Sequence, residues 1–222
     1  MPAEECDVNA VDLRVCSLVD LDRPLCCASR DAVTLAGEAT AVMVRPGSVS
    51  TREMIERMRQ LKGALGEMPP LLAVGRVDVA LAAGLAGVLL GRSDMTPSDA
   101  RRLLGPRALV GMEIHEPAHA DELYRWPVDF AVIGRTGAHS SPTPLDPEMV
   151  GRISFRVRLA APGTATAAFA AWAPGPAALL IGAGVDGIVC PAPDPGSADA
   201  PPLRLRARID EALTLRRQFQ RL

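Results

Sequence analysis

Residues 71–90, LLAVGRVDVALAAGLAGVLL, hold the pattern that decides the fold. Two short apolar runs, 71–74 and 87–90, flank a segment that fits a helix. Short apolar runs bounded by glycine are typical of buried strands. A strand, a helix and a second strand in this order predict two parallel strands joined by a crossover helix.

Similar apolar runs recur along the chain. They are found at 13–19, 40–44, 71–74, 87–90, 108–112, 129–133, 155–159 and 185–190. Eight strands that alternate with helices are the number that closes into a (β/α)8 barrel, the TIM barrel. An open, doubly wound sheet is the alternative. We expect one such domain over residues 1–222, with a proline-rich loop at 191–202 before the last helix.

Helix signals lie between these runs. Ser50 and Glu53 form a capping box ahead of a helical apolar stripe, and Thr96 precedes a proline at the start of another helix. Pro117 and Pro147 also stand at first helical positions. Further helices are predicted over 166–172 and 206–222.

Composition places the chain among ordinary globular proteins, with 48% hydrophobic and 23% charged residues. A net charge of −2 and an aromatic content of 3% argue against nucleic-acid binding. No apolar stretch reaches the roughly 20 residues that cross a bilayer, and the first residues are acidic rather than signal-like. We therefore expect a cytoplasmic protein without a membrane or nucleic-acid partner. Five cysteines without paired CxxC spacing predict neither a disulfide framework nor a zinc site.

Ionisable side chains stand at the carboxyl ends of several predicted strands, where the active sites of (β/α)8 barrels gather. They are Arg45, Asp94, Glu113 and Arg135. Glu113 and Arg135 follow neighbouring strands, so an ion pair between them is expected. If a ligand occupies the pocket, Arg45 and Arg135 anchor its negative charge and Glu113 is the nearest general base. Alternatively, the ion pair fills the pocket. Cys190 also ends a strand facing the pocket, and we interpret it as a buried thiol rather than a nucleophile.

Several motifs together resemble the thiamin phosphate synthase superfamily. They are the stretch 72–91, Asp94, the segment 100–105, His115, and the segments 129–134 and 183–188, in the order typical of that superfamily. The resemblance implies a (β/α)8 barrel that handles phosphorylated heterocycles. A synthase of this kind joins a pyrimidine diphosphate to a thiazole phosphate, and a TenI-type tautomerase aromatises the thiazole phosphate.

The resemblance also implies a magnesium ion, held against the diphosphate by one aspartate after the third strand and another after the fourth. Asp94 matches the second aspartate, whereas Gly75 stands in place of the first. Because Mg²⁺ is held by carboxylates together with substrate phosphates, we expect no metal and no cofactor here. The loop after strand six lacks the family's lysine. Ser140 and Ser141 in that loop are candidate phosphate donors, or parts of a plain turn.

The glycine at position 75 also matches the tautomerase branch of the superfamily, which has a glycine at this position. In that branch a histidine follows the strand-six glycine, but Arg135 stands there in this chain and cannot shuttle protons at neutral pH. His139 is either a substitute proton shuttle or a solvated loop histidine. Gly163, in the loop after the expected strand 155–159, is a candidate for a partial phosphate-binding nest of backbone N–H groups.

These patterns predict a divergent, magnesium-independent barrel that binds a phosphorylated or anionic heterocycle and is not a standard thiamin phosphate synthase. As an enzyme, it is expected to be an isomerase of the tautomerase type or a transferase. The alternative is a non-catalytic binding or scaffold protein on the same fold. The expected partner is a small anionic ligand, and the resemblance adds a homodimer as the candidate assembly.

Overall fold

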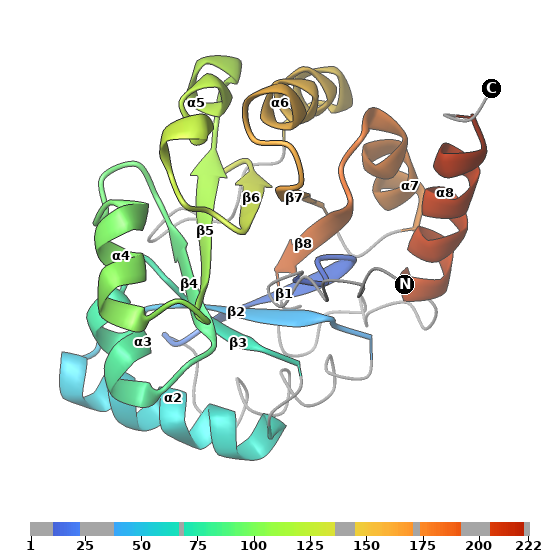
Figure 1. Cartoon of the computed structure of the whole chain (residues 1–222). Helices are drawn as coiled ribbons and strands as arrows, with labels where there is room; N and C mark the ends of the chain where they lie inside the picture. The colour runs from blue at the N-terminus through green and yellow to red at the C-terminus, as the bar shows by residue number, and fades with distance from the viewer. Residues whose placement is uncertain are drawn as a thin grey trace, which may run out of the picture.

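The computed structural model describes residues 11–22, 38–66, 69–135, 145–170, 174–191 and 205–219. Strands and helices alternate along these segments (Figure 1). The strands are β1 (Val15–Asp20), β2 (Ala41–Arg45), β3 (Leu71–Val74), β4 (Gly87–Leu90), β5 (Leu109–Ile114), β6 (Phe130–Ile133), β7 (Ala165–Phe169) and β8 (Gly187–Pro191). The helices are α2 (Thr51–Leu65), α3 (Val77–Ala83), α4 (Pro97–Leu104), α5 (Pro117–Asp121), α6 (Pro147–Ala160), α7 (Pro174–Ala183) and α8 (Leu205–Phe219), with a 3₁₀ turn at Leu123–Arg125.

The eight strands form a closed barrel in which each strand is parallel to the next, and β8 pairs with β1 to complete the ring. This confirms the predicted (β/α)8 barrel, and the alternative of an open sheet is wrong. The closing contact joins Val15 to Ile188 and Ser17 to Cys190 in register. The proline-rich loop expected at 191–202 lies outside the described residues, except for Pro191 at the end of β8.

The side chains inside the barrel come from every second residue of the strands. The interior cluster includes Cys16 and Leu18 of β1 and Ala41 and Met43 of β2, whereas Val19 packs against the outer helices. This alternation follows from the two-residue period of a strand. At the carboxyl ends of the strands, the residues that continue this inward-facing alternation therefore face the barrel opening.

Glycines make room for two large rings inside the barrel. A Cβ built on Gly111 would lie 2.2 Å from the ring of Phe130, and one built on Gly134 would lie 2.7 Å from the ring of Phe169. Both phenylalanines are almost completely buried. These aromatic rings thus pack directly against glycine backbone, which gives the interior the close packing expected of a protein core.

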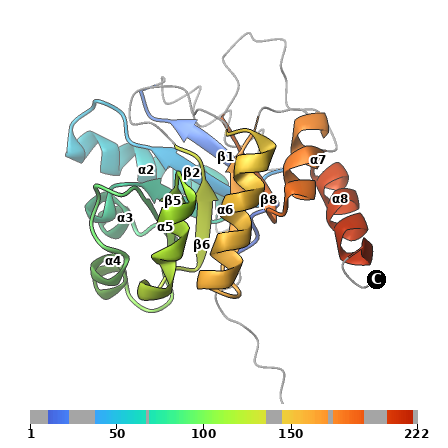
Figure 2. The same cartoon turned by 90° about the horizontal axis from the view of Figure 1, so that it is seen from above.

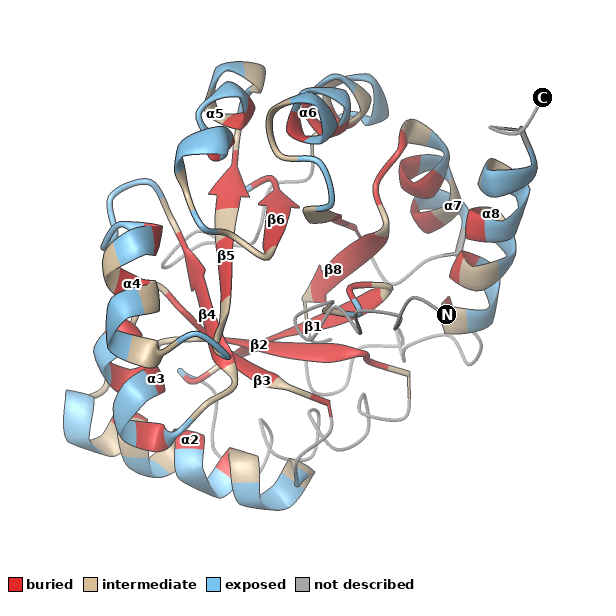
Figure 3. Cartoon of the chain, in the orientation of Figure 1, coloured by how far each residue is buried: buried red, intermediate tan, exposed pale blue. Residues whose placement is uncertain are grey.

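The helices surround the barrel (Figures 1 and 2), and their buried residues lie on the side that faces the strands (Figure 3). Met54, Met58 and Leu61 on α2 are buried, at the spacing of one helical face. Ser50 caps this helix by accepting a hydrogen bond from the Glu53 backbone N–H at 3.3 Å, as predicted. Among the described helices, none combines the length and apolar character needed to cross a membrane.

The segment 145–170 corrects the sequence interpretation. The predicted strand at 155–159 is part of α6, and the predicted helix at 166–172 overlaps strand β7. Asp146 caps α6 by accepting a hydrogen bond from Met149 N–H at 2.9 Å, and Pro147 stands at its first turn. From this start the buried residues Val150, Ile153 and Val157 recur at helical spacing, which a short apolar window at 155–159 hides.

Two aspartates tie strands together at the amino ends of the barrel. Asp129 Oδ2 accepts a hydrogen bond from the Val110 backbone N–H at 2.7 Å and pairs with Arg101 of α4 at 2.6 Å. Asp186 Oδ2 accepts a hydrogen bond from the Thr166 backbone N–H at 2.9 Å, and Asp186 Oδ1 pairs with Arg216 of α8 at 2.8 Å. Each carboxylate therefore links two neighbouring strands to an outer helix.

We expect Asp129→Ala to lower the free energy of unfolding by about 2 to 4 kcal/mol, because it removes the carboxylate partner of the largely buried Arg101 guanidinium and leaves the Val110 N–H without its acceptor. Urea unfolding followed by circular dichroism measures the change. Asp121→Ala is the matched control, since its pair with Arg156 is half exposed and should contribute less than about 0.5 kcal/mol. Equal losses in the two variants contradict this role of Asp129.

Candidate active site

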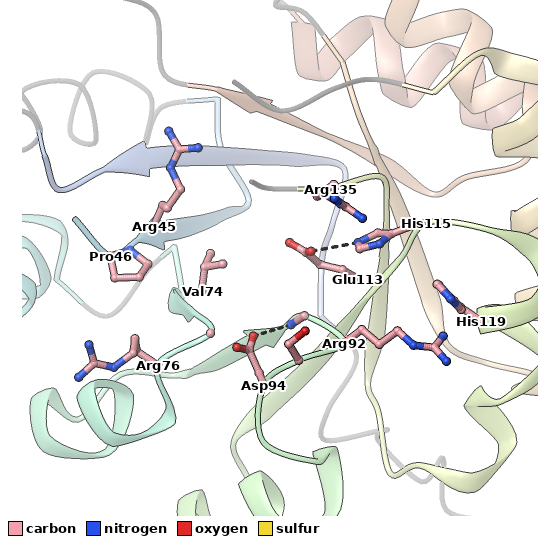
Figure 4. A pocket seen from close by; sticks show the side chains of 13 residues that line it. Arg45, Pro46, Val74, Arg76, Arg92, Asp94, Glu113, His115, His119 and Arg135 are labelled. Atoms are coloured by element: carbon pink, nitrogen blue, oxygen red, sulfur yellow. Dashed lines mark hydrogen bonds and ion pairs between the residues drawn. The ribbon is translucent and has the colours of Figure 1, made fainter. Parts of the chain in front are cut away.

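A pocket of about 490 Å³ opens at the carboxyl ends of the strands, here called the mouth of the barrel. This is the end at which (β/α)8 barrels carry their active sites. Figure 4 shows the side chains that line the pocket. They are Arg45, Pro46, Val74, Gly75, Arg76, Gly91, Arg92, Ser93, Asp94, Glu113, His115, His119 and Arg135. The four ionisable residues predicted at the strand ends thus share one cavity.

Glu113 brings a buried carboxylate into the pocket. It follows Leu109 and Gly111 on the inner face of β5, and its side chain is only 5% exposed. His115 Nε2 lies 3.2 Å from Glu113 Oε2, in hydrogen-bonding contact. The expected ion pair with Arg135 is absent from the contacts between described residues, so the interpretation that this pair fills the pocket was wrong. Arg135 is exposed, and Figure 4 shows its side chain next to His115.

Asp94 is held by the turn that follows β4. Its backbone N–H donates to the carbonyl of Gly91 at 3.1 Å, and the Gly91 N–H donates to its Oδ2 at 2.7 Å. Such local bonds between an aspartate and its own turn fix the direction of the carboxylate. Oδ1 accepts no hydrogen bond from any residue of the described segments. Asp94 is therefore fixed through one oxygen and offers the other to the pocket (Figure 4).

Gly75 occupies the position directly after β3, with a φ of +72° that favours glycine. A Cβ built there would lie 3.1 Å from Asp94 Oδ2. The neighbouring Arg76 turns away from the pocket centre and binds Asp78 at 2.6 Å and Thr51 at 3.0 Å (Figure 4). Its hydrogen bond with Asp78 raises the pKa of the Arg76 guanidinium and lowers that of the carboxyl.

Arg45 ends β2 on the same inner face as Met43. Its Nε donates a hydrogen bond to Asp20 Oδ2 at 3.1 Å. Asp20 ends β1 in the same way and is aligned with Arg45 in the sheet. The sequence interpretation missed Asp20, although its two-residue spacing from Cys16 and Leu18 places it on the interior face.

His119 and Arg92 were also missed. His119 lies on α5, the short helix that follows β5 and has a proline in its first turn. Its ring contacts the His115 ring edge-on, with the two ring centroids 5.9 Å apart. Burial lowers the pKa of His119, which favours the neutral imidazole. Arg92 lies in the loop after β4 and is 3.9 Å from Glu122. A polar residue after a strand end is the signal that could have indicated Arg92, whereas nothing local indicates His119.

Gly163 lies at the opposite end of the barrel from the pocket. It precedes β7, because the predicted strand 155–159 is helical, and its φ of +90° serves the turn from α6 into β7. Its predicted part in a phosphate nest at the mouth is therefore wrong. The candidates His139, Ser140 and Ser141 lie outside the described residues.

Cys190 faces the outer helices and not the pocket, which corrects the direction expected for it. It packs with Leu205 and Ile209 of α8, while Cys16 lies inside the barrel. Neither thiol forms a disulfide with a described residue, and both are fully buried, as a structural interpretation of Cys190 predicts. Burial raises the pKa of each thiol far above its usual range.

The carboxylates of the pocket are the hard oxygen donors that Mg²⁺ prefers. No group of three or more histidine, cysteine, aspartate or glutamate side chains gathers around one point in the described part of the chain. A metal at this pocket would therefore take part of its ligands from a bound phosphate, which is how Mg²⁺ is commonly held.

Comparison with known proteins gives consistent matches. A family model described as "Thiamine monophosphate synthase" matches residues 26–191. The Thiamine-phosphate synthase of Albidiferax ferrireducens is 33% identical over 186 residues, which is 81% of this chain and 83% of that protein. That of Agrobacterium fabrum is 40% identical over 131 residues, 57% of this chain and 59% of that protein, so this alignment spans less than two thirds of the relative. The solved thiamine phosphate pyrophosphorylase of Pyrococcus furiosus superimposes with a TM-score of 0.74 at 25% identity, covering 92% of this chain and 98% of that one.

These matches contradict the function predicted from the sequence. Relatives that are 33% to 45% identical carry the name Thiamine-phosphate synthase. The prediction of a divergent, magnesium-independent barrel outside the standard synthases was therefore wrong. The error came from weighing single replaced positions, Gly75 and Arg135, without knowing which side chains the fold brings beside them.

In the native protein we expect neither Cys16 nor Cys190 to react with iodoacetamide at mildly alkaline pH, because burial and a raised pKa suppress the thiolate. Both should react once guanidinium chloride unfolds the chain. Mass spectrometry of the tryptic peptides measures the two states. Rapid native labelling at Cys190 contradicts its place beneath α8.

Proposed function

Because the chain belongs to the thiamine monophosphate synthase family, we propose that it is a thiamine-phosphate synthase, which joins a pyrimidine diphosphate to a thiazole phosphate. The observation that carries this proposal is the pocket at the mouth, which is lined by four arginines together with Asp94 and Glu113. Asp94 is at the position that matches a magnesium ligand of the synthases. The cavity of about 490 Å³ falls within the range of small-molecule sites.

The charge balance of the reaction explains why such a pocket needs cations. The product carries one phosphate, which comes from the thiazole, so the diphosphate is the leaving group. The bond between the pyrimidine-bearing carbon and a diphosphate oxygen breaks, while a bond from that carbon to the thiazole forms. Negative charge grows on the departing oxygen in the transition state. Cationic groups that already surround this oxygen stabilise that charge without reorganisation.

The pocket arginines differ in how far they are already engaged. Arg76 is bound to Asp78, and Arg45 to Asp20. Arg135 is exposed at the rim and forms no ion pair with any described residue. A guanidinium presents a planar fork of donors that matches phosphate oxygens. We therefore assign the anchoring of a substrate phosphate first to Arg135.

The residues present fit the magnesium ion that the family implies. Asp94 offers Oδ1 to the pocket, and its Oδ2 borders the space that Gly91 leaves open. When bound, Mg²⁺ neutralises charge on a diphosphate and so favours its departure. The contribution of the chain is to hold Asp94 in one orientation through the Gly91 N–H.

The reaction tests this assignment directly. Purified protein incubated with the pyrimidine diphosphate, the thiazole phosphate and Mg²⁺ should form thiamine phosphate and release one diphosphate per product, measured by chromatography and a coupled diphosphate assay. Chelation by EDTA should abolish turnover, and added Mg²⁺ should restore it. Absence of product under these conditions contradicts the proposed activity.

We expect Arg135→Ala to lower kcat/KM by roughly 10- to 100-fold, since a hydrogen bond from a charged donor contributes about 1.5 to 3 kcal/mol. Steady-state kinetics with each substrate varied in turn shows which phosphate Arg135 anchors. Arg107→Ala is the matched control, because Arg107 is exposed in the loop before β5, at the opposite end of the barrel. Unchanged kinetics in Arg135→Ala contradict the anchoring role.

A further inference from the structure

Two carboxylates from different elements meet in the pocket. Asp94 comes from the loop after β4, and Glu113 comes from within β5. A Cβ built on Gly91 would lie 3.2 Å from Asp94 Oδ2 and 3.7 Å from Glu113 Oε2. Both oxygens therefore border the small space that the missing side chain of Gly91 leaves open. In Figure 4 the two carboxylates turn toward the middle of the pocket, while Arg45, Arg76 and Arg92 reach its margins.

We infer that Glu113 is a ligand of the divalent cation together with Asp94, supplying from β5 the second carboxylate that Gly75 does not supply from β3. The inference deepens the proposed function and rests on it for the diphosphate that completes the coordination. Sequence comparison at position 75 alone misses this arrangement, because the replacement comes from a neighbouring strand and not from the same position.

The geometry at Gly75 explains why Glu113 can take over this role. A side chain at position 75 would begin 3.1 Å from Asp94 Oδ2, the same oxygen that borders the space beside Gly91. With glycine at position 75, the two carboxylates beside the Gly91 space are those of Asp94 and Glu113. Mg²⁺ bound to substrate phosphates typically uses one or two carboxylates of the protein, so the number present is sufficient.

The surroundings of Glu113 suit a ligand whose orientation is fixed. Its side chain is 5% exposed, and His115 Nε2 lies 3.2 Å from its Oε2. Carboxylates that bind metals are in turn held by hydrogen bonds, which orient their remaining lone pairs toward the ion. His115 is therefore a positioning residue for Glu113. The pocket arginines do not replace the cation at Asp94, because none of them lies within ion-pair distance of it in the described structure.

Binding of Mn²⁺, used as a probe for Mg²⁺, tests the inference without an activity readout. Mn²⁺ is titrated into the full chain with equimolar inorganic pyrophosphate, and the enhancement of water proton relaxation reports the protein-bound ion. We expect Glu113→Gln and Asp94→Asn each to weaken Mn²⁺ binding by roughly 10- to 100-fold, since each removes a charged ligand and keeps the side-chain size. Glu148→Gln, an exposed residue on α6, is the matched control and should bind as the wild type does.

A rescue experiment separates loss of a ligand from damage to the pocket. Glu113→Ser should bind Mn²⁺ weakly, and the double variant Gly75→Asp with Glu113→Ser should recover at least part of the affinity by returning a carboxylate through β3. Aspartate is among the residues that tolerate positive φ, so the double variant is compatible with the turn at position 75. Thermal unfolding of every variant shows whether the fold is retained.

The outcomes separate this inference from the proposed function. Wild-type Mn²⁺ affinity in a folded Glu113→Gln variant overturns the role of Glu113 and leaves the synthase activity standing. Absence of any Mn²⁺ binding by the wild type with pyrophosphate also overturns it. Binding that depends on Glu113 in a protein that forms no thiamine phosphate supports the metal site and contradicts the proposed function alone.

Discussion

Closure of the barrel is the constraint on which the rest of the structure depends. Once β8 pairs with β1, every strand has an inner and an outer face, and the two-residue period assigns each side chain to one of them. The apolar inner residues fill the lower layers of the barrel, with Phe130 and Phe169 standing over glycines. The next residues in the same inner register, among them Arg45 and Glu113, line the pocket.

The chemistry of the pocket follows from which residue types occupy that uppermost inner layer. Asp20, Arg45 and Glu113 each continue an inward series of their own strand. Asp20 and Arg45 neutralise each other, whereas Glu113 faces the glycine that ends the inward series of β4. Charged groups at this depth are partly shielded from water, so their mutual interactions are stronger than at an open surface. A site that must hold a diphosphate and its counter-ion gains from that shielding.

The two ends of the barrel use charged residues for different purposes. At the amino ends of the strands, Asp129 and Asp186 are fully engaged with backbone N–H groups and with arginines of the outer helices, so they stabilise the fold. At the carboxyl ends, Asp94 is engaged through only one oxygen. The carboxylates at the amino ends of the strands thus have their hydrogen-bonding partners within the fold, whereas Asp94 at the carboxyl ends has an oxygen left to bind a ligand. This agrees with the general arrangement of stability and function in (β/α)8 barrels.

The sequence by itself located seven of the eight strands, their parallel order, most helix starts and the strand ends at which Arg45, Asp94, Glu113 and Arg135 stand. These features depend on local periodicity and capping chemistry, which a single chain displays directly. Only the tertiary structure decided that 155–159 is helical, that Gly163 lies at the far end, that Glu113 contacts His115, and that Asp94 and Glu113 border the same space beside Gly91. A short apolar window fits a helix or a strand equally well, and which side chains meet across the mouth depends on closure of the ring, to which residues far apart in the sequence contribute.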